Sequence, residues 1–309
     1  MQWEIVRTKP VGRTLGLQIP AFIHNMQYHY APLAVYGDGL VDCWGSVDLD
    51  IFLRKLKTGW VVTEAPPGSM VCFHNLGSAI VRTCDWKNSP ADLLKRVNAG
   101  INSLNPDRSG LINLNGEEAE MRGKVRYSKF GLTNGKPYRV DADGNEVLGD
   151  SIPVFLQAGS DFQLKPWFIY ADGSSRVGRT GSLKPLNEVA TGLTGGDLRT
   201  SAPDGSRITI EGLGWFESKS SGWHVKPEER VREAYDALEK LKGEQGAMRN
   251  CMNCFREYQT DLSLENRDRL RLAYEAVPEH LRHYCGDMDS QDWPIRRIIY
   301  GEETETRRP

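Results

Sequence analysis

The chain has 309 residues, of which 39% are hydrophobic and 26% are charged, with 31 Gly, 16 Pro and a net charge of −2. This composition is that of an ordinary globular protein and excludes a disordered or fibrous chain. The balanced charge also gives no overall attraction to phosphate backbones or anionic lipid. Because single hydrophobic cores tend to stop growing beyond about 250 to 300 residues, we expect more than one domain.

The chain shows no targeting or membrane-spanning pattern. Its start has no apolar run behind basic residues, and no uncharged apolar stretch reaches the roughly 18 residues that span a bilayer. Six cysteines are few for this length and unlike a secreted disulfide scaffold. These features predict a cytoplasmic protein with reduced thiols and no membrane partner.

A first module is predicted over residues 1–103. Its expected elements are, in chain order, an extended segment ending at Tyr36, a hairpin strand, a helix capped by Asp48, three short strands, and a helix starting at Ser89-Pro90. Gly37-Asp38-Gly39 supplies the hairpin turn. The predicted order is ββαβββα.

The sequence repeats itself at an offset of 137 residues. Thr63-Glu-Ala-Pro-Pro-Gly-Ser69 matches Thr200-Ser-Ala-Pro-Asp-Gly-Ser206 at five of seven positions, and Trp86 falls on Trp223. The matched residue types fix special backbone angles or fill large packed spaces. We therefore predict a second copy of the module over residues 148–242. Each of the two tryptophans is expected close to the Leu-Gly turn of its own module.

The second module is expected to have a broken first helix, because Pro185 and three glycines interrupt residues 183–196. Between the modules, residues 104–147 contain Asn134-Gly135 and Asp143-Gly144, which are typical of hairpin turns. Short apolar runs flank these turns, at Val125, Tyr127 and Phe130. This stretch is predicted to be a β-rich connector.

From residue 243 to residue 309 the composition becomes helical. Leu270, Tyr274, Val277, Leu281 and Tyr284 follow a spacing of four, three, four and three residues, which predicts a seam that packs on another helix or on a module. The predicted fold class is therefore α+β, with two tandem modules, a β-rich connector and a helical C-terminal segment.

Two parts of the chain resemble families without an assigned activity. Tyr36-Gly-Asp-Gly-Leu-Val-Asp-Cys-Trp-Gly45, with Thr58-Gly-Trp-Val-Val-Thr63 and Leu76-Gly77, resembles a widespread family of uncharacterised bacterial domains. Tyr274-Glu-Ala-Val-Pro-Glu-His-Leu-Arg282, with the segments 286–289 and 294–297, is similar to a second uncharacterised bacterial segment. The resemblance implies a bacterial origin and implies nothing about chemistry.

The duplicated module carries no repeated catalytic constellation, and the usual nucleotide-binding and hydrolase motifs do not occur. This pattern favours a non-enzymatic bacterial adaptor that binds another protein through tandem modules. Aromatic residues dominate interface energetics, so Tyr36, Trp44 and Trp60 are the candidate anchors. Module one is the better candidate because Gly178 and Asp197 occupy the aligned places of the two tryptophans. Burial of both tryptophans in the core is the competing interpretation.

Two alternatives remain open. Nucleic acid is a possible partner through aromatic residues and the arginine-bearing C-terminal segment, including Arg296 and Arg297, although a salt-bridged helix surface accounts for these arginines too. A metal-dependent enzyme is the other alternative. Cys251-Met-Asn-Cys254 has the spacing of a zinc site that His283 and Cys285 would complete. Buried small residues are the simpler interpretation of these cysteines, so we expect no cofactor.

Overall fold

A computed structural model describes residues 3–8, 12–114, 135–287 and 289–301. The chain divides into two compact units, Met1–His224 and Val225–Pro309. The first unit contains all the named strands and three helices, and the second is helical. The α+β class predicted from the sequence is therefore confirmed. The predicted connector features at Val125, Tyr127, Phe130 and Asn134 lie outside the described residues.

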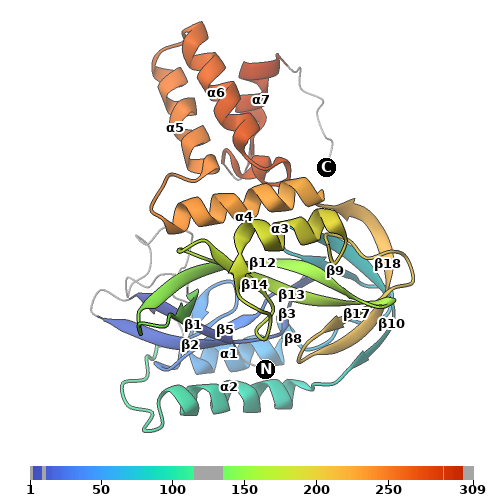
Figure 1. Cartoon of the computed structure of the whole chain (residues 1–309). Helices are drawn as coiled ribbons and strands as arrows, with labels where there is room; N and C mark the ends of the chain where they lie inside the picture. The colour runs from blue at the N-terminus through green and yellow to red at the C-terminus, as the bar shows by residue number, and fades with distance from the viewer. Residues whose placement is uncertain (1–2, 9–11, 115–134, 288, 302–309) are drawn as a thin grey trace. The chain divides into compact units, whose positions relative to one another are not determined.

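Module one has more strands before its first helix than the sequence predicts. In chain order its elements are β1 (Trp3–Thr8), β2 (Arg13–Ile19), β3 (Phe22–Asn25), β4 (Gln27–Tyr30), β5 (Leu33–Tyr36), β6 (Val41–Asp42), β7 (Ser46–Val47), α1 (Leu49–Lys57), β8 (Val61–Val62), β9 (Met70–Phe73), β10 (Gly77–Trp86) and α2 (Pro90–Leu104). The helices begin where predicted, because the Asp48 side chain caps α1 and Ser89 forms a capping box at α2. Figure 1 shows α1 and α2 next to the strands of this module.

Module two repeats this order with longer, unbroken strands. Its elements are β11 (Lys136–Val140), β12 (Glu146–Ala158), β13 (Asp161–Tyr170), β14 (Ser174–Val177), β15 (Lys184–Pro185), α3 (Leu186–Gly195), β16 (Leu198–Arg199), β17 (Arg207–Ile210), β18 (Gly214–His224) and α4 (Pro227–Leu241), of which α4 falls in the second unit. Strand β11 and the start of β12 lie in the stretch that the sequence assigned to the connector. They pair with each other as β1 pairs with β2.

The strand pairings of the two modules correspond one by one. Among the described residues, the parallel pairs are β4 with β9, where Tyr28 lies opposite Val71, and β13 with β17, where Phe162 lies opposite Ile208. The short strands β8 and β16 likewise pair antiparallel with β3 and β12. Equal order and equal pairing confirm the shared topology predicted from the repeat.

The two modules are joined by two antiparallel pairings, a short one of β1 with β11 and a long one of β10 with β18. Val81 lies opposite Ser218, and these positions are equivalent in the repeat. Trp86 therefore lies opposite Gly214, the turn glycine of the other module. The expectation that each tryptophan lies near its own Leu-Gly turn is wrong, because the long strand carries it away to its partner's turn.

The first helix of module two is formed, contrary to the sequence prediction. Helix α3 starts directly after Pro185 and ends at Gly196, which has φ +115°. Proline is tolerated at a helix start because the N–H it lacks has no helical partner there, and a left-handed glycine is a common helix end. Leu186, Val189 and Leu193 are buried along its inner face. Pro185 and Gly196 thus mark the boundaries of the helix, and the helix tolerates Gly192 and Gly195 within it.

The second unit contains α4, α5 (Ala247–Thr260), α6 (Leu264–Ala276), the 3-10 helix η2 (Glu279–Tyr284) and α7 (Trp293–Tyr300). Its core holds four residues of the predicted seam, Leu270, Tyr274, Val277 and Leu281, whereas the fifth, Tyr284, is 45% exposed. Buried charges join α4 to η2, because Glu233 accepts from Arg230 and bonds the His280 ring at 2.9 Å. Burial disfavours the charged carboxylate, but these two bonds outweigh it and lower the pKa of Glu233.

Each module contains the same arginine, tyrosine and aspartate cluster. In module one the Arg7 guanidinium lies 3.7 Å from the Tyr36 ring centre and donates to both carboxylate oxygens of Asp38 at 2.6 Å. In module two Arg139 lies 5.3 Å from the Tyr170 ring and pairs with Asp172. The tyrosine ring in each module leaves room only for glycine on the neighbouring strand. A Cβ at Gly16 would lie 2.6 Å from Tyr36 Cδ1, and one at Gly149 would lie 2.9 Å from Tyr170 Cδ1.

The two ion pairs differ in burial, and this difference predicts a difference in stability. The Asp38 side chain is 6% exposed, whereas that of Asp172 is 40% exposed. We expect D38N to lower the free energy of unfolding by about 3 to 5 kcal/mol, because it leaves a buried guanidinium charge uncompensated. D172N should cost less than about 1 kcal/mol. Urea denaturation of both variants measures this, and equal losses would contradict the interpretation.

Candidate functional site

Module one displays a group of three rings in edge-on contact, which we call the tryptophan patch and define as His29, Trp44 and Trp60. The Trp44 ring lies 4.9 Å from the His29 ring and 6.1 Å from the Trp60 ring, edge-on to both. Trp44 is 53% exposed. Trp60 is partly buried and packs against the core of module one. The patch thus has an exposed ring on a fixed support.

The backbone of Trp44 is in the left-handed region, with φ +68°. A bulky residue in this region is uncommon and costs roughly 1 to 2 kcal/mol relative to glycine. The equivalent position in module two is Gly178, with φ +70°. Both copies therefore need a left-handed residue at this turn, and only module one places a large exposed side chain there.

The turn that carries Trp44 is held by Asp42. Its carboxylate accepts hydrogen bonds from the backbone N–H groups of Gly45, at 3.2 Å, and Trp44. Burial raises the pKa of Asp42, and these bonds oppose that rise. Module two has Arg176 at the equivalent position, lying over the Phe168 ring at 5.6 Å. The two modules therefore stabilise this region by different means.

Positive charge borders the tryptophan patch. The last turn of α1 carries Arg54, Lys55 and Lys57, and the Lys55 ammonium lies 5.1 Å from the Trp60 ring centre. A cation over an indole face is attracted by the ring's negative face. The patch is therefore an aromatic surface with a basic margin. Neither His29 nor Lys55 was predicted, because no sequence spacing relates residue 29 or 55 to residue 44.

The third predicted anchor, Tyr36, does not belong to this surface. It is 1% exposed, and burial raises the pKa of its hydroxyl while Arg7 opposes the rise. An alternating aromatic strand does not reveal which of its faces is covered, and Tyr36 points to the covered face. Its role in the described structure is to pack against Gly16 and Arg7.

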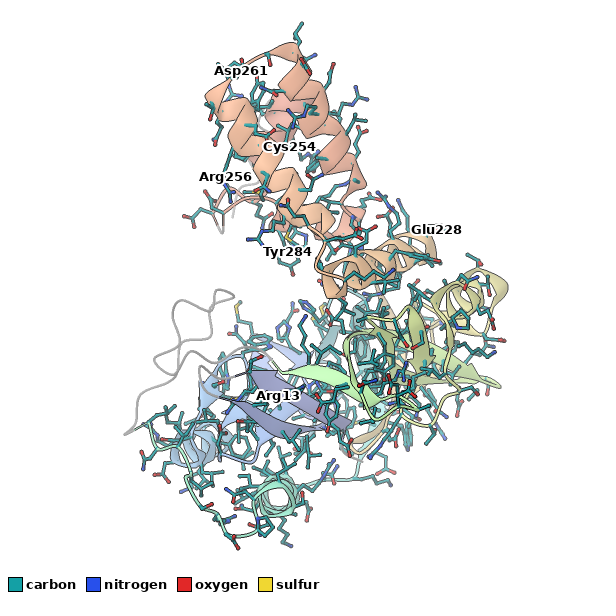
Figure 2. The ribbon with its side chains drawn as sticks, turned by 60° about the vertical axis from the view of Figure 1, so that its left-hand side comes forward. Arg13, Glu228, Cys254, Arg256, Asp261 and Tyr284 are labelled. Carbon is teal, nitrogen blue, oxygen red and sulfur yellow. The ribbon has the colours of Figure 1, made fainter. Side chains whose placement is uncertain are left out.

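The three C-terminal cysteines lie in the core of the second unit. Cys251 and Cys254 are on α5, and Figure 2 shows Cys254 within the helical unit. A hydrogen bond joins the Cys251 and Cys285 thiols. This bond and burial both raise the pKa of Cys251, whereas the same bond lowers the pKa of Cys285 against the opposing effect of burial. The His283 ring lies tilted against the Tyr284 ring, with ring centres 3.8 Å apart. No three His, Cys, Asp or Glu side chains of the described residues are grouped to hold a metal ion.

The remaining predicted residues, Arg296 and Arg297, are exposed on α7. The Arg296 backbone N–H continues the helix by donating to Asp292 at 3.0 Å. These arginines and the tryptophan patch belong to different units of the chain. Binding of nucleic acid to Arg296 and Arg297 stays a prediction.

The fold and the patch define a duplicated α+β protein with one aromatic surface on its first module. The chain belongs to the family DUF7638, a domain of unknown function, whose model matches residues 1–108 and 136–245. Residues 246–309 match the model of DUF7639, also a domain of unknown function. Comparison with curated proteins and with solved structures returned no match. No helix in the described part of the chain combines the length and apolar character needed to cross a bilayer.

The cysteine geometry predicts the metal content of the purified protein. A closed zinc site needs about four ligands and binds tightly. We expect less than about 0.2 equivalents of zinc in protein purified without chelator, measured by elemental analysis. A content near one equivalent would restore the zinc hypothesis for Cys251, Cys254, His283 and Cys285.

The left-handed turn predicts that Trp44 adds little to stability. W44G removes the backbone strain but also removes ring contacts and loosens the unfolded chain, so its unfolding free energy should stay within about 1 kcal/mol of the original. In module two, G178A should lose about 1 to 2 kcal/mol, because alanine is strained at this angle. Thermal or urea unfolding measures both variants. A large loss in W44G would mean that Trp44 is a core residue.

Proposed function

We propose that the chain is a non-enzymatic adaptor that binds another protein through the tryptophan patch of module one. The observation that carries this proposal is Trp44 itself, a half-exposed indole at a backbone angle that module two satisfies with glycine. Strain kept in a folded protein is commonly found where it serves binding or catalysis. A residue that costs stability at the surface is best explained by what it contacts outside the chain.

The margin of the patch indicates the chemistry of the partner. Trp and Tyr anchors contribute most when a ring of polar contacts excludes water around them. Here Lys55 lies over the Trp60 ring, and the same last turn of α1 also carries Arg54 and Lys57. Opposite charge across an interface speeds association and selects the partner. The partner therefore presents an apolar side chain to Trp44, flanked by acidic residues.

Module two supplies a matched control for this proposal. Trp223 is 50% exposed, as Trp44 is 53% exposed, but it lies on β18. With the full chain as bait in an extract of the source cells, we expect a co-eluting protein that W44G loses and W223A retains. With the purified partner, W44G should weaken binding by more than about 1 kcal/mol while the melting temperature stays nearly unchanged.

Equal retention of every co-eluting protein by the original chain and W44G would overturn the proposal. Binding to nucleic acid is a separate outcome of the same variants. An oligonucleotide that shifts the chain at about 50 mM salt, and shifts W44G less, would make the patch a base-stacking surface instead.

A further inference from the structure

Module one carries large apolar side chains at two backbone positions that module two fills with glycine. Trp44 is one of them. Met26 is the other: it has φ +60°, and its equivalent Gly159 has φ +66°. The repeat aligns these two residues because Phe22 matches Phe155 at an offset of 133 residues. Both residues also lie where a strand pair turns back, β3 with β4 in module one and β12 with β13 in module two.

Met26 shares with Trp44 the combination of backbone strain and exposure. It stands at the tip of the β3–β4 hairpin and is 96% exposed. A bulky residue at a left-handed angle strains the backbone, and a side chain this exposed has no core packing to offset the strain. At another such position module one has Asn75 where module two has Gly212, but asparagine tolerates this angle better. Met26 therefore calls for the same explanation as Trp44, a contact outside the chain.

The hairpin of Met26 extends from the tryptophan patch. Strand β3 pairs with β8, and the His24 backbone N–H donates to the Trp60 carbonyl oxygen at 2.8 Å. His29, the ring on the other side of Trp44, lies on β4 three residues after Met26. At about 3.3 Å per residue, the tip is roughly 10 Å along the strand from His29. Met26 and Trp44 are therefore two exposed apolar groups roughly 10 to 15 Å apart.

Contacts on both strands stabilise the hairpin below its tip. The His24 and Tyr28 rings lie opposite each other and are stacked, with centres 4.5 Å apart. Gln27, next to the tip, accepts a hydrogen bond from the Cys72 thiol at 2.9 Å, which joins β4 to the neighbouring β9. Methionine itself is flexible and polarizable, so it adapts to varied apolar surfaces. The tip thus presents an adaptable side chain on an ordered support.

We infer that the partner covers Trp44 and Met26 with one short extended segment, through two apolar side chains four residues apart. Side chains of an extended segment alternate between its faces, so residues four apart lie on one side and about 13 Å from each other. A segment this short does not hold a helix by itself. The basic last turn of α1 beside Trp60 favours acidic residues in the same segment. This inference rests on the adaptor function proposed above and specifies the form of the partner.

Synthetic peptides of about twelve residues test this inference on the full chain. Each has acidic ends and two leucines that are two, three, four, five or seven positions apart, with serine and glycine elsewhere. Fluorescence anisotropy of a dye at one end measures binding. We expect the peptide with leucines four apart to bind at least about fivefold more tightly than those with leucines three or five apart, and than a peptide with one leucine. Lysine in place of the acidic ends should weaken binding by a similar factor.

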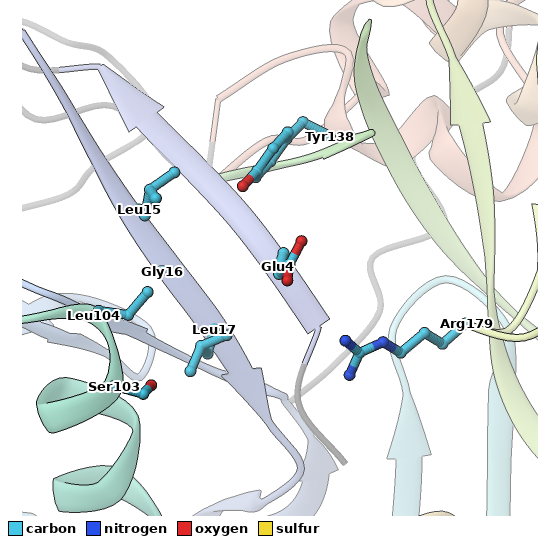
Figure 3. A pocket seen from close by; sticks show the side chains of 8 residues that line it. All are labelled: Glu4, Leu15, Gly16, Leu17, Ser103, Leu104, Tyr138 and Arg179. Atoms are coloured by element: carbon cyan, nitrogen blue, oxygen red, sulfur yellow. The ribbon is translucent and has the colours of Figure 1, made fainter. Parts of the chain in front are cut away.

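Variants of the chain assign this preference to Met26. M26N removes the apolar side chain and keeps a residue that tolerates the left-handed angle, so its melting temperature should stay the same. It should bind peptides with two leucines no better than peptides with one, whereas W44G should weaken binding of every peptide. Leu15 supplies a matched control, because it is 46% exposed but lines a cleft of about 310 Å³ that neither Met26 nor Trp44 lines (Figure 3). L15S should bind every peptide as the original chain does.

Equal affinity across the peptide series, or an unchanged preference in M26N, would overturn the inference. Failure of every peptide to bind would overturn it too, while a co-eluting protein that only W44G loses would still support the adaptor function. Two other occupants of this surface have their own signatures. A dimer of the original chain that M26N loses in light scattering would indicate a second copy, and vesicles of phosphatidylserine that bind the original chain and not M26N would indicate a lipid surface. Either result overturns the extended segment.

Discussion

The arrangement of the first unit depends on the pairing of β10 with β18. Because Val81 faces its own repeat equivalent, Ser218, the pairing is self-complementary in the way that a two-fold dimer interface is. The end of each strand then meets the glycine at the start of the other. A Cβ at Gly77 would lie 2.8 Å from the Trp223 carbonyl oxygen, and one at Gly214 would overlap the backbone of Asp85. Glycine is thus required at both ends of the same interface.

This backbone symmetry does not extend to the side chains. Trp86 packs edge-on to Phe22 at 5.3 Å, and its indole N–H donates to the Ala65 carbonyl at 2.8 Å. Its equivalent, Trp223, is half exposed beside a small cavity of about 20 Å³ that Phe155 also lines. One module therefore closes its end of the interface with a tryptophan, and the other leaves that tryptophan at the surface. The two modules thus share their strand order and pairing, whereas their surface side chains differ.

Local rules in the sequence predicted the parts of the fold that depend on local chemistry. The caps at Asp48 and Ser89 and the repeated glycine and proline positions follow from backbone angles and hydrogen bonds within a few residues. The predicted position of Trp86 was wrong because it depends on the pairing of β10 with β18. These strands lie 137 residues apart in the sequence, and no local pattern reveals their pairing. The prediction of a broken helix in module two was wrong because Pro185 stands at the start of α3 and does not interrupt it.

The candidate site divides in the same way. Trp44 and Trp60 were found as aromatic residues that module two lacks, which is a comparison the sequence allows. Tyr36 has the residue type of a binding anchor, but its pairing with Gly16 places its ring over that glycine, inside the fold. His29 reaches the patch through long-range strand pairing, because it lies opposite Ile23 on β3 and Ile23 lies opposite Val61, the residue after Trp60. Chemistry assembled from distant segments leaves little trace in spacing.

The position of Trp44 explains why the patch suits binding without a large rearrangement. The Asp42 carboxylate stabilises the turn that carries Trp44. The Trp44 ring contacts the Trp60 ring edge-on, and Trp60 packs against the core of module one. A side chain that is already ordered loses less conformational entropy when a partner covers it, by roughly 0.5 to 1.5 kcal/mol for each immobilised side chain. The backbone strain of Trp44 at φ +68° lowers the stability of the folded chain, and partner binding adds no further strain. Module two, with Gly178 and Arg176 at the two equivalent positions, has neither the ring nor the acidic group that holds this turn. Module one therefore differs from module two in two ways: it has the exposed indole, and it holds that indole in an ordered position before a partner binds.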